Sequence, residues 1–173
     1  ARSTNHLLAV KSITTASKQK LIGVSFIDIT SNITNVGIIV DDEHLTLFKA
    51  LISKISPTEA VYQENGIDPL IMTVLSSSVV SPYFSPLERS KYWTEYEART
   101  QLASYFGNDE DLWPEALRQL GHLPIQEYEI AMAAFSGCIS YLRKMLIFER
   151  IMDAGRFVFY DPRNIAKTNM ILD

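Results

Sequence analysis

Aliphatic residues fill three stretches near the start of the chain, at positions 6–13, 21–30 and 34–40. These stretches are rich in Leu, Ile and Val, which favours β-strands. The polar segment TTASKQK separates the first two, and Ser31-Asn32 lies between the second and the third. Asn tolerates the left-handed backbone conformation that tight hairpins require. The pattern therefore predicts an antiparallel meander of three strands.

The spacing of apolar residues then changes from that of a strand to that of a helix. Leu, Phe and Ile recur at intervals of three and four over residues 45–55, which predicts a helix. Asp41 and Asp42 precede it and are placed to cap its N-terminus. Pro57 ends this helix, and the segment 59–63 indicates another strand. The order strand, helix, strand predicts a crossover to a parallel neighbour in the sheet.

The rest of the chain predicts further elements: helices over 70–75, 92–106 and 126–152, and a short strand over 79–84. Asp68-Pro69 opens the first of these helices and Gly107 ends the second. The helix over 126–152 is apolar on several faces, so we expect it to lie between two layers of structure. Because this helix is so apolar, we also expect the domain by itself to expose an apolar strip.

Composition places the chain among ordinary globular domains. Its 173 residues fit one domain, and 47% hydrophobic content is enough to form a core. The 16 basic and 20 acidic residues are interspersed, although the basic residues Arg2, Lys11, Lys18 and Lys20 precede any acid. A nucleic-acid-binding domain usually carries a clustered excess of basic residues. We therefore do not expect this chain to hold DNA by itself.

Several other classes of protein are disfavoured by simple features of the sequence. The nearest glycines are 14 positions apart and none precedes a lysine, so neither phosphate-binding motif can be built. The apolar run over 130–152 contains Arg143 and Lys144, whose charges disfavour a membrane span. No secretory signal is visible, and the absence of an initial Met favours a missing native N-terminus.

The residue types that usually perform chemistry are few and scattered. A single cysteine, Cys138, excludes an intrachain disulfide and a cysteine-based zinc cluster. It falls on the apolar side of a predicted helix, so we expect a buried, inert thiol. His6, His44 and His122 form no metal-binding motif, and structural or surface roles are expected. We therefore predict no catalytic, cofactor-binding or metal-binding residues.

Asp28 is the candidate for an alternative, enzymatic function. It ends an apolar strand, and ribonuclease H-like nucleases hold two metals with carboxylates that begin at such a position. The other acids, among them Glu64, Asp68 and Asp153, do not occupy obviously matching positions. We favour a simpler role in which Asp28 bonds its own turn. A metal-dependent nuclease remains the alternative hypothesis.

The most acidic stretch of the chain covers residues 108–115. One interpretation is a binding surface for a basic partner. The other, which we favour, is a solvated loop whose acids start a helix near Trp113-Pro114.

Several segments, read in order, resemble the connector domain of MutS proteins. They are IGVSFIDITSNITNVGIIVDDEHLTLFKALISKISPTEAVYQEN over 22–65, YWTEYEARTQLASYF over 92–106, AMAAFSGCISYLRKMLIFERIMDAG over 131–155 and MILD over 170–173. The resemblance covers nearly the whole chain and is strongest to the sixth eukaryotic MutS homologue. Asn32 replaces the family's usual glycine in the first hairpin and keeps a residue that tolerates positive φ.

This resemblance implies a ribonuclease H-like α/β fold, with a mixed sheet flanked by helices. It implies a connector domain over residues 1–155 and, over 156–173, the start of the segment that enters the lever. The expected function is a non-catalytic relay between mismatch-binding and ATPase domains, which also offers a docking surface. The expected partners are other domains of the same protein, a second MutS homologue subunit, a MutL-type protein and, through the full-length protein, mismatched DNA. ATP and magnesium would bind outside this chain, and the location would be the nucleus.

Overall fold

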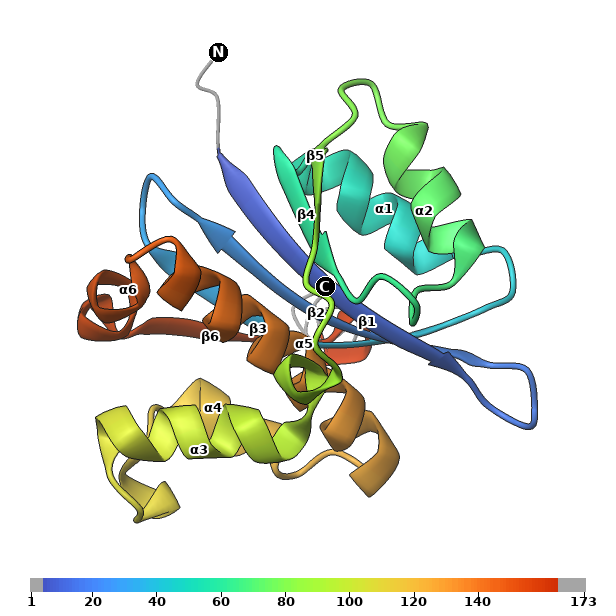
Figure 1. Cartoon of the computed structure of the whole chain (residues 1–173). Helices are drawn as coiled ribbons and strands as arrows, with labels where there is room; N and C mark the ends of the chain where they lie inside the picture. The colour runs from blue at the N-terminus through green and yellow to red at the C-terminus, as the bar shows by residue number, and fades with distance from the viewer. Residues whose placement is uncertain (1–4, 165–173) are drawn as a thin grey trace, which may run out of the picture.

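The computed structural model describes residues 5–164 and contains a six-stranded mixed sheet in the order β5-β4-β1-β2-β3-β6 (Figure 1). The centre of the sheet is the predicted meander, in which β1 (His6–Thr14), β2 (Lys20–Asp28) and β3 (Ile33–Asp41) are antiparallel neighbours. Asn32 adopts φ 59° in the turn before β3. The predicted α/β fold, with a ribonuclease H-like mixed sheet flanked by helices, is thus confirmed.

The outer strands run parallel to their neighbours. The predicted strand β4 (Glu59–Tyr62) pairs with β1, and β5 (Tyr83–Pro86) pairs with β4. The prediction placed β5 at 79–84, which was too early along the chain. Val79 and Val80 precede the strand and are exposed. On the opposite edge, β6 (Arg156–Tyr160) pairs with β3.

The β6 pairing was not predicted. The resemblance predicts that residues 156–173 start the segment that enters the lever, whereas residues 156–160 form an edge strand of the sheet. The segment MILD at 170–173, which also carried the resemblance, lies outside the described residues.

Two short helices cover one face of the sheet, α1 (Thr46–Ile55) and α2 (Pro69–Ser76) (Figure 1). Both predicted caps of α1 are confirmed. Asp41 accepts hydrogen bonds from the backbone N–H groups of Leu47 and Phe48, and Asp42 accepts from that of Thr46. These two carboxylates satisfy donors that a helix start leaves without partners.

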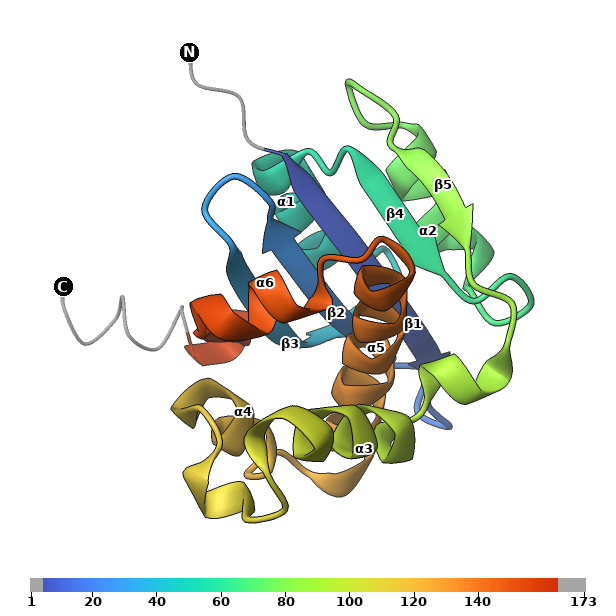
Figure 2. The ribbon, with the colours of Figure 1, turned by 60° about the vertical axis from the view of Figure 1, so that its left-hand side comes forward.

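The other face is covered by the remaining helices: η1 (Ser90–Trp93), α3 (Glu95–Phe106), η2 (Glu110–Leu112), α4 (Glu115–Leu120), α5 (Ile125–Lys144) and α6 (Phe148–Ala154). Figure 2 shows α5 across the sheet, with α3 on its outer side. The approach to the sheet is close, since a Cβ on Gly23 would lie 2.1 Å from the carbonyl oxygen of Ile130. The predicted position of the long apolar helix between two layers is confirmed.

The prediction of one continuous helix over 126–152 was wrong. The chain turns at Met145, and Leu146 adopts φ 62°, so α5 and α6 are separate helices. The expected apolar strip is also absent from α5, because residues 130–139 are buried under the sheet and α3. Over residues 5–164, we find no helix with the length and apolar character needed to cross a membrane.

The predicted helix over 92–106 is interrupted near its start. It begins as the 3₁₀ turn η1, and α3 follows after Thr94, whose side chain accepts from the backbone N–H of Glu97. Its buried residues include Ala98 and Leu102, whereas Tyr96 is 76% exposed. Gly107, at φ 92°, ends the helix as predicted.

Candidate functional sites

Asp28 lies at the end of β2, where its side chain bonds its own turn. One carboxylate oxygen accepts a hydrogen bond of 3.0 Å from the backbone N–H of Thr30. Slight burial opposes ionisation, but this hydrogen bond and others from Ser31 keep the pKa of Asp28 below its ordinary value. Its partner in the β1–β2 register is His6, where burial lowers the pKa despite the nearby charge of Asp28. The predicted turn role of Asp28 is confirmed.

The other acids considered with Asp28 occupy different parts of the fold. Asp68 accepts from the N–H of Leu70 at the start of α2 and pairs with Lys20 at 2.7 Å. Lys20 begins β2 and Asp28 ends it, so they lie about 26 Å apart at strand spacing. Glu64 is exposed after β4, and Asp153 is exposed on α6. Among residues 5–164, no three His, Cys, Asp or Glu side chains gather as a metal site.

The remaining candidates for chemistry are separated from one another. Cys138 is fully buried on α5, and burial raises the pKa of its thiol to about 12. A thiol in this state is protonated and shielded, and so inert, as predicted. His44 is exposed beside Glu43 at 3.4 Å, and His122 is exposed in the turn after α4.

The basic residues near the start of the chain are used largely within the fold. Lys11 is half-buried and donates a 2.6 Å hydrogen bond to Gln63, and burial lowers its pKa. Lys20 is paired with Asp68, while Lys18 is exposed in the turn between β1 and β2. Arg2 lies outside the described residues. Two of these cations therefore have partners inside the domain.

The acidic stretch over 108–115 forms η2 and the start of α4. Asp109 accepts from the backbone N–H of Asp111, and Glu115 stands in the first turn of α4. Helix starts favour such negative charges, so the predicted role of these acids is confirmed. Glu110 forms an ion pair with Arg99 of α3, which also contacts Glu95 at 3.4 Å.

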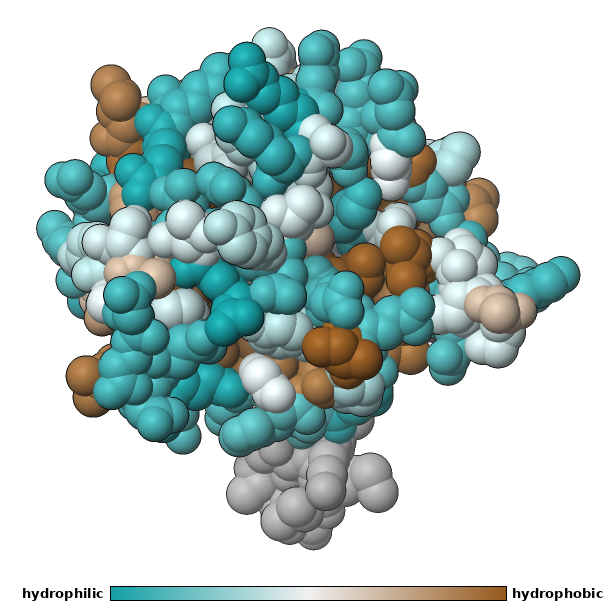
Figure 3. Space-filling model, turned by 60° about the horizontal axis from the view of Figure 1, so that its bottom comes forward, coloured by the Kyte–Doolittle hydropathy of each residue, from teal (hydrophilic) through white to brown (hydrophobic). Residues whose placement is uncertain are grey.

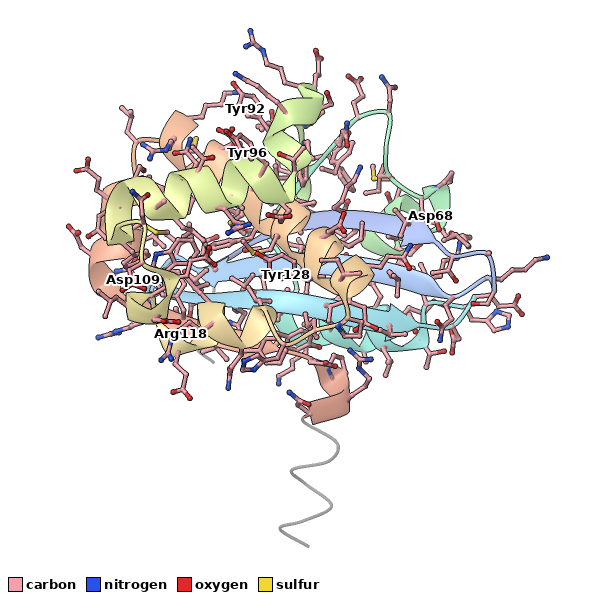
Figure 4. All side chains as sticks on the ribbon, turned by 90° about the horizontal axis from the view of Figure 1, so that it is seen from below. Asp68, Tyr92, Tyr96, Asp109, Arg118 and Tyr128 are labelled. Carbon is pink, nitrogen blue, oxygen red and sulfur yellow. The ribbon has the colours of Figure 1, made fainter. Side chains whose placement is uncertain are left out.

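A shallow groove of about 710 Å³ lies between α3 and this stretch, with Tyr96, Arg99 and Trp113 in its walls. Figure 4 shows Tyr96 on α3, Tyr128 on α5 and Asp109 on the neighbouring segment. Burial, with the nearby charge of Glu95, raises the pKa of Tyr128 to about 12. The groove can offer hydrogen bonds and an aromatic face, but its strongest charges already pair with one another.

Hydrophobic side chains on the surface are dispersed. On the face seen in Figure 3, they form small brown islands within a hydrophilic surround. The large ones exposed on the whole described surface are Leu47, Leu70, Val79, Val80, Tyr83, Tyr96, Tyr105, Leu112, Ile125, Met145, Leu146 and Val158. Separate exposed residues of this kind are normal, whereas contiguous ones point to interfaces.

Sequence reasoning missed a partly buried polar junction centred on Glu59. This β4 carboxylate accepts hydrogen bonds from the hydroxyl of Tyr141 on α5 and, at 2.6 Å, from that of Ser85 on β5. Burial and the bond to Glu59 raise the pKa of Tyr141. The junction ties α5 to two strands at one edge of the sheet.

Comparison with known proteins matches this architecture to one family. The family model described as MutS domain II matches residues 5–149. The DNA mismatch repair protein Msh6 of Gallus gallus is 25% identical over 172 residues, covering 91% of this chain and 13% of the relative. Msh6 of Homo sapiens is 24% identical, covering 81% and 11% respectively. MSH6 of Saccharomyces cerevisiae is 23% identical, covering 89% and 12%.

The fold defines the class, an α/β domain built on a ribonuclease H-like mixed sheet with helices on both faces. Within that class, the chain belongs to the MutS domain II family. It is a connector domain of the Msh6-like kind and spans about an eighth of the relatives it matches.

Proposed function

We propose that this chain is the non-catalytic connector of an Msh6-like mismatch-repair protein. In this role it links the mismatch-binding part of the protein to the lever and ATPase parts. The observation that carries the proposal is the match of MutS domain II to residues 5–149. Because the chain spans only 11–13% of its relatives, mismatch contact and ATP hydrolysis are assigned to the remainder of the full-length protein.

A relay must move as one body, and the packing of α5 supports this. Gly23 permits contact of α5 with β2 on one side, and Gly137 permits contact with Trp93 on the other. Glu59 adds a hydrogen-bonded junction between α5 and the strand edge. An element held from three directions transmits displacement rather than absorbing it.

A cluster of ion pairs lies directly after β6. Asp161 is buried directly after the strand, and both of its carboxylate oxygens accept from the guanidinium of Arg163. The same guanidinium pairs at 2.6 Å with Glu127 in the first turn of α5. We therefore propose that the segment toward the lever starts after these ion pairs. This boundary is later than the one at residue 155 that is expected from the sequence.

The proposed setting is a nuclear complex. Its partners are a second MutS homologue subunit, a MutL-type protein that docks on the connectors, and mismatched DNA bound through the full-length protein. The names of the Msh6 relatives and the family of the domain support this setting.

The test replaces residues 5–164 by a flexible Gly-Ser linker in the full-length protein. We expect mismatch binding and basal ATP turnover to persist, while stimulation of ATP turnover by mismatched DNA and recruitment of the MutL-type protein are lost. The control keeps the domain and inserts a Gly-Ser linker of the same length at the exposed Ser17-Lys18 turn. Mismatch stimulation that survives the replacement would refute the relay.

A further inference from the structure

A short turn joins α5 to α6 (Figure 2). A leucine in an unfavourable backbone conformation closes it. The N–H of Leu146 donates to the carbonyl of Arg143, and that of Ile147 donates to the carbonyl of Leu142, both at 3.0 Å. This pair of bonds defines a Schellman cap, in which the left-handed position is usually glycine. Leu146 takes this position at φ 62°.

The side chain of Leu146 gains little from the fold in return. It is 92% exposed, and its neighbour Met145 is 51% exposed. A leucine in the left-handed region is disfavoured relative to glycine, and an exposed apolar side chain recovers none of that cost by burial. Backbone strain of this kind is characteristic of functional positions. Neither burial nor a side-chain contact within the described residues accounts for a leucine at this position.

The charges near the turn determine which kind of partner surface would be complementary to it. The exposed basic residues Arg143, Lys144 and Arg150 flank it along the chain and outnumber the exposed acids there, Glu149 and Asp153. The guanidinium of Arg143 lies 3.8 Å from the ring centroid of Phe148, which holds it beside a recess of about 280 Å³. An apolar tip within a basic collar is complementary to an apolar socket edged by carboxylates.

We propose that Met145 and Leu146 form a docking knob that inserts into such an acid-edged apolar socket on a protein surface of the assembled repair complex. The proposal rests on the proposed function, since it requires that the domain works inside a larger assembly. It commits to a protein as the partner, and phosphate of nucleic acid is the competing occupant that the test separates.

The experiment measures alkylation by N-ethylmaleimide of Leu146→Cys, in this chain alone and in the full-length protein assembled with its second MutS subunit. The modified peptide is quantified by mass spectrometry, so other cysteines do not interfere. Val79→Cys, fully exposed in another turn, is the matched control. We expect alkylation at 146 to be at least about tenfold slower in the assembly, with no slowing at 79. Equal rates at 146 in the two states would overturn the proposal.

Further measurements separate the docking knob from its alternatives. Reversal of charge in Lys144→Glu with Arg150→Glu should abolish the protection at 146, and protection that appears only with DNA would overturn the choice of a protein partner.

Leu146→Gly should raise the Tm of this chain alone by roughly 2–4 °C, and a lower Tm would show that the leucine serves the fold. Free reaction at 146 with intact mismatch-stimulated ATP turnover would refute the knob and leave the connector function standing.

Discussion

The indole ring of Trp93 occupies the space that a side chain at Gly137 would need. A Cβ at position 137 would lie 2.3 Å from Cζ3 of that ring. The ring cannot easily withdraw, since Trp93 is buried and its Nε1 donates a 2.8 Å hydrogen bond to the carbonyl of Leu87. This contact fixes the outer side of α5, just as the contact of Gly23 with Ile130 fixes its inner side.

We predict that Gly137→Ala destabilises the domain by about 1–3 kcal/mol, the usual cost of overpacking a core. Urea denaturation of the purified chain measures the change. Glu129→Ala, at an exposed position on the same helix, should change the free energy of unfolding by less than about 0.5 kcal/mol. Combining Gly137→Ala with Trp93→Phe should cost less than the sum of the two single changes. Additive costs would show that the ring is not the obstacle.

We predict that Tyr141→Phe costs about 1–2 kcal/mol, because it removes a hydroxyl that donates to the partly buried carboxylate of Glu59. Tyr83→Phe removes a hydroxyl from a side chain that is 73% exposed and should be nearly neutral. Glu59→Gln combined with Tyr141→Phe tests the pairing through a double-mutant cycle in urea. If the cycle yields no coupling energy, the two groups do not stabilise one another.

The meander and the first crossover could be predicted from sequence because their signals are local. Alternating apolar segments and a turn-forming Asn32 specify the three strands, and Asp41 and Asp42 announce the helix that follows. Each of these features acts within a few residues of the structure that it determines.

The break between α5 and α6 had no such signal. The cap residue Leu146 is neither glycine nor asparagine, and no proline interrupts residues 125–154. The Glu59 junction was invisible for a different reason, since Tyr141 is 82 positions away in the chain. The strand β6 was missed because its five residues gain their place only by pairing with β3.

The Lys20–Asp68 ion pair should make stability depend on acidity. Burial opposes ionisation of Asp68, but the hydrogen bonds from Lys20 and from the Leu70 N–H lower its pKa in the folded state. A lowered pKa stabilises the fold above the unfolded value of about 4, and this contribution is lost as the pH falls through the folded-state pKa. We predict that Asp68→Asn lowers the free energy of unfolding by about 1 kcal/mol at pH 7. The same change should make the decrease of stability at acidic pH less steep.

Urea denaturation from pH 7 down to about pH 3 checks this prediction. Lys20→Met should resemble Asp68→Asn at neutral pH, while Glu64→Gln, which changes an exposed acid in the same region, should follow the unmodified chain. If the stability of Asp68→Asn decreases with falling pH as steeply as that of the unmodified chain, other carboxylates cause the acid sensitivity.

The rate at which the Cys138 thiol is modified measures how firmly α5 is held between the sheet and α3. Its thiol is fully buried, and burial raises its pKa to about 12, so at pH 8 it is both protonated and inaccessible. Since the thiolate is the reactive species, we predict that a disulfide reagent modifies the native chain at least about a thousandfold more slowly than the chain in concentrated guanidinium chloride. Ser104→Cys, exposed on α3, should react rapidly under both conditions. Gly137→Ala should accelerate modification of Cys138 by about tenfold for each 1.4 kcal/mol of stability that it removes, because the reagent gains access only when the layers separate. Rapid reaction of Cys138 in the unmodified native chain would contradict the rigid attachment of α5 on which the proposed relay depends.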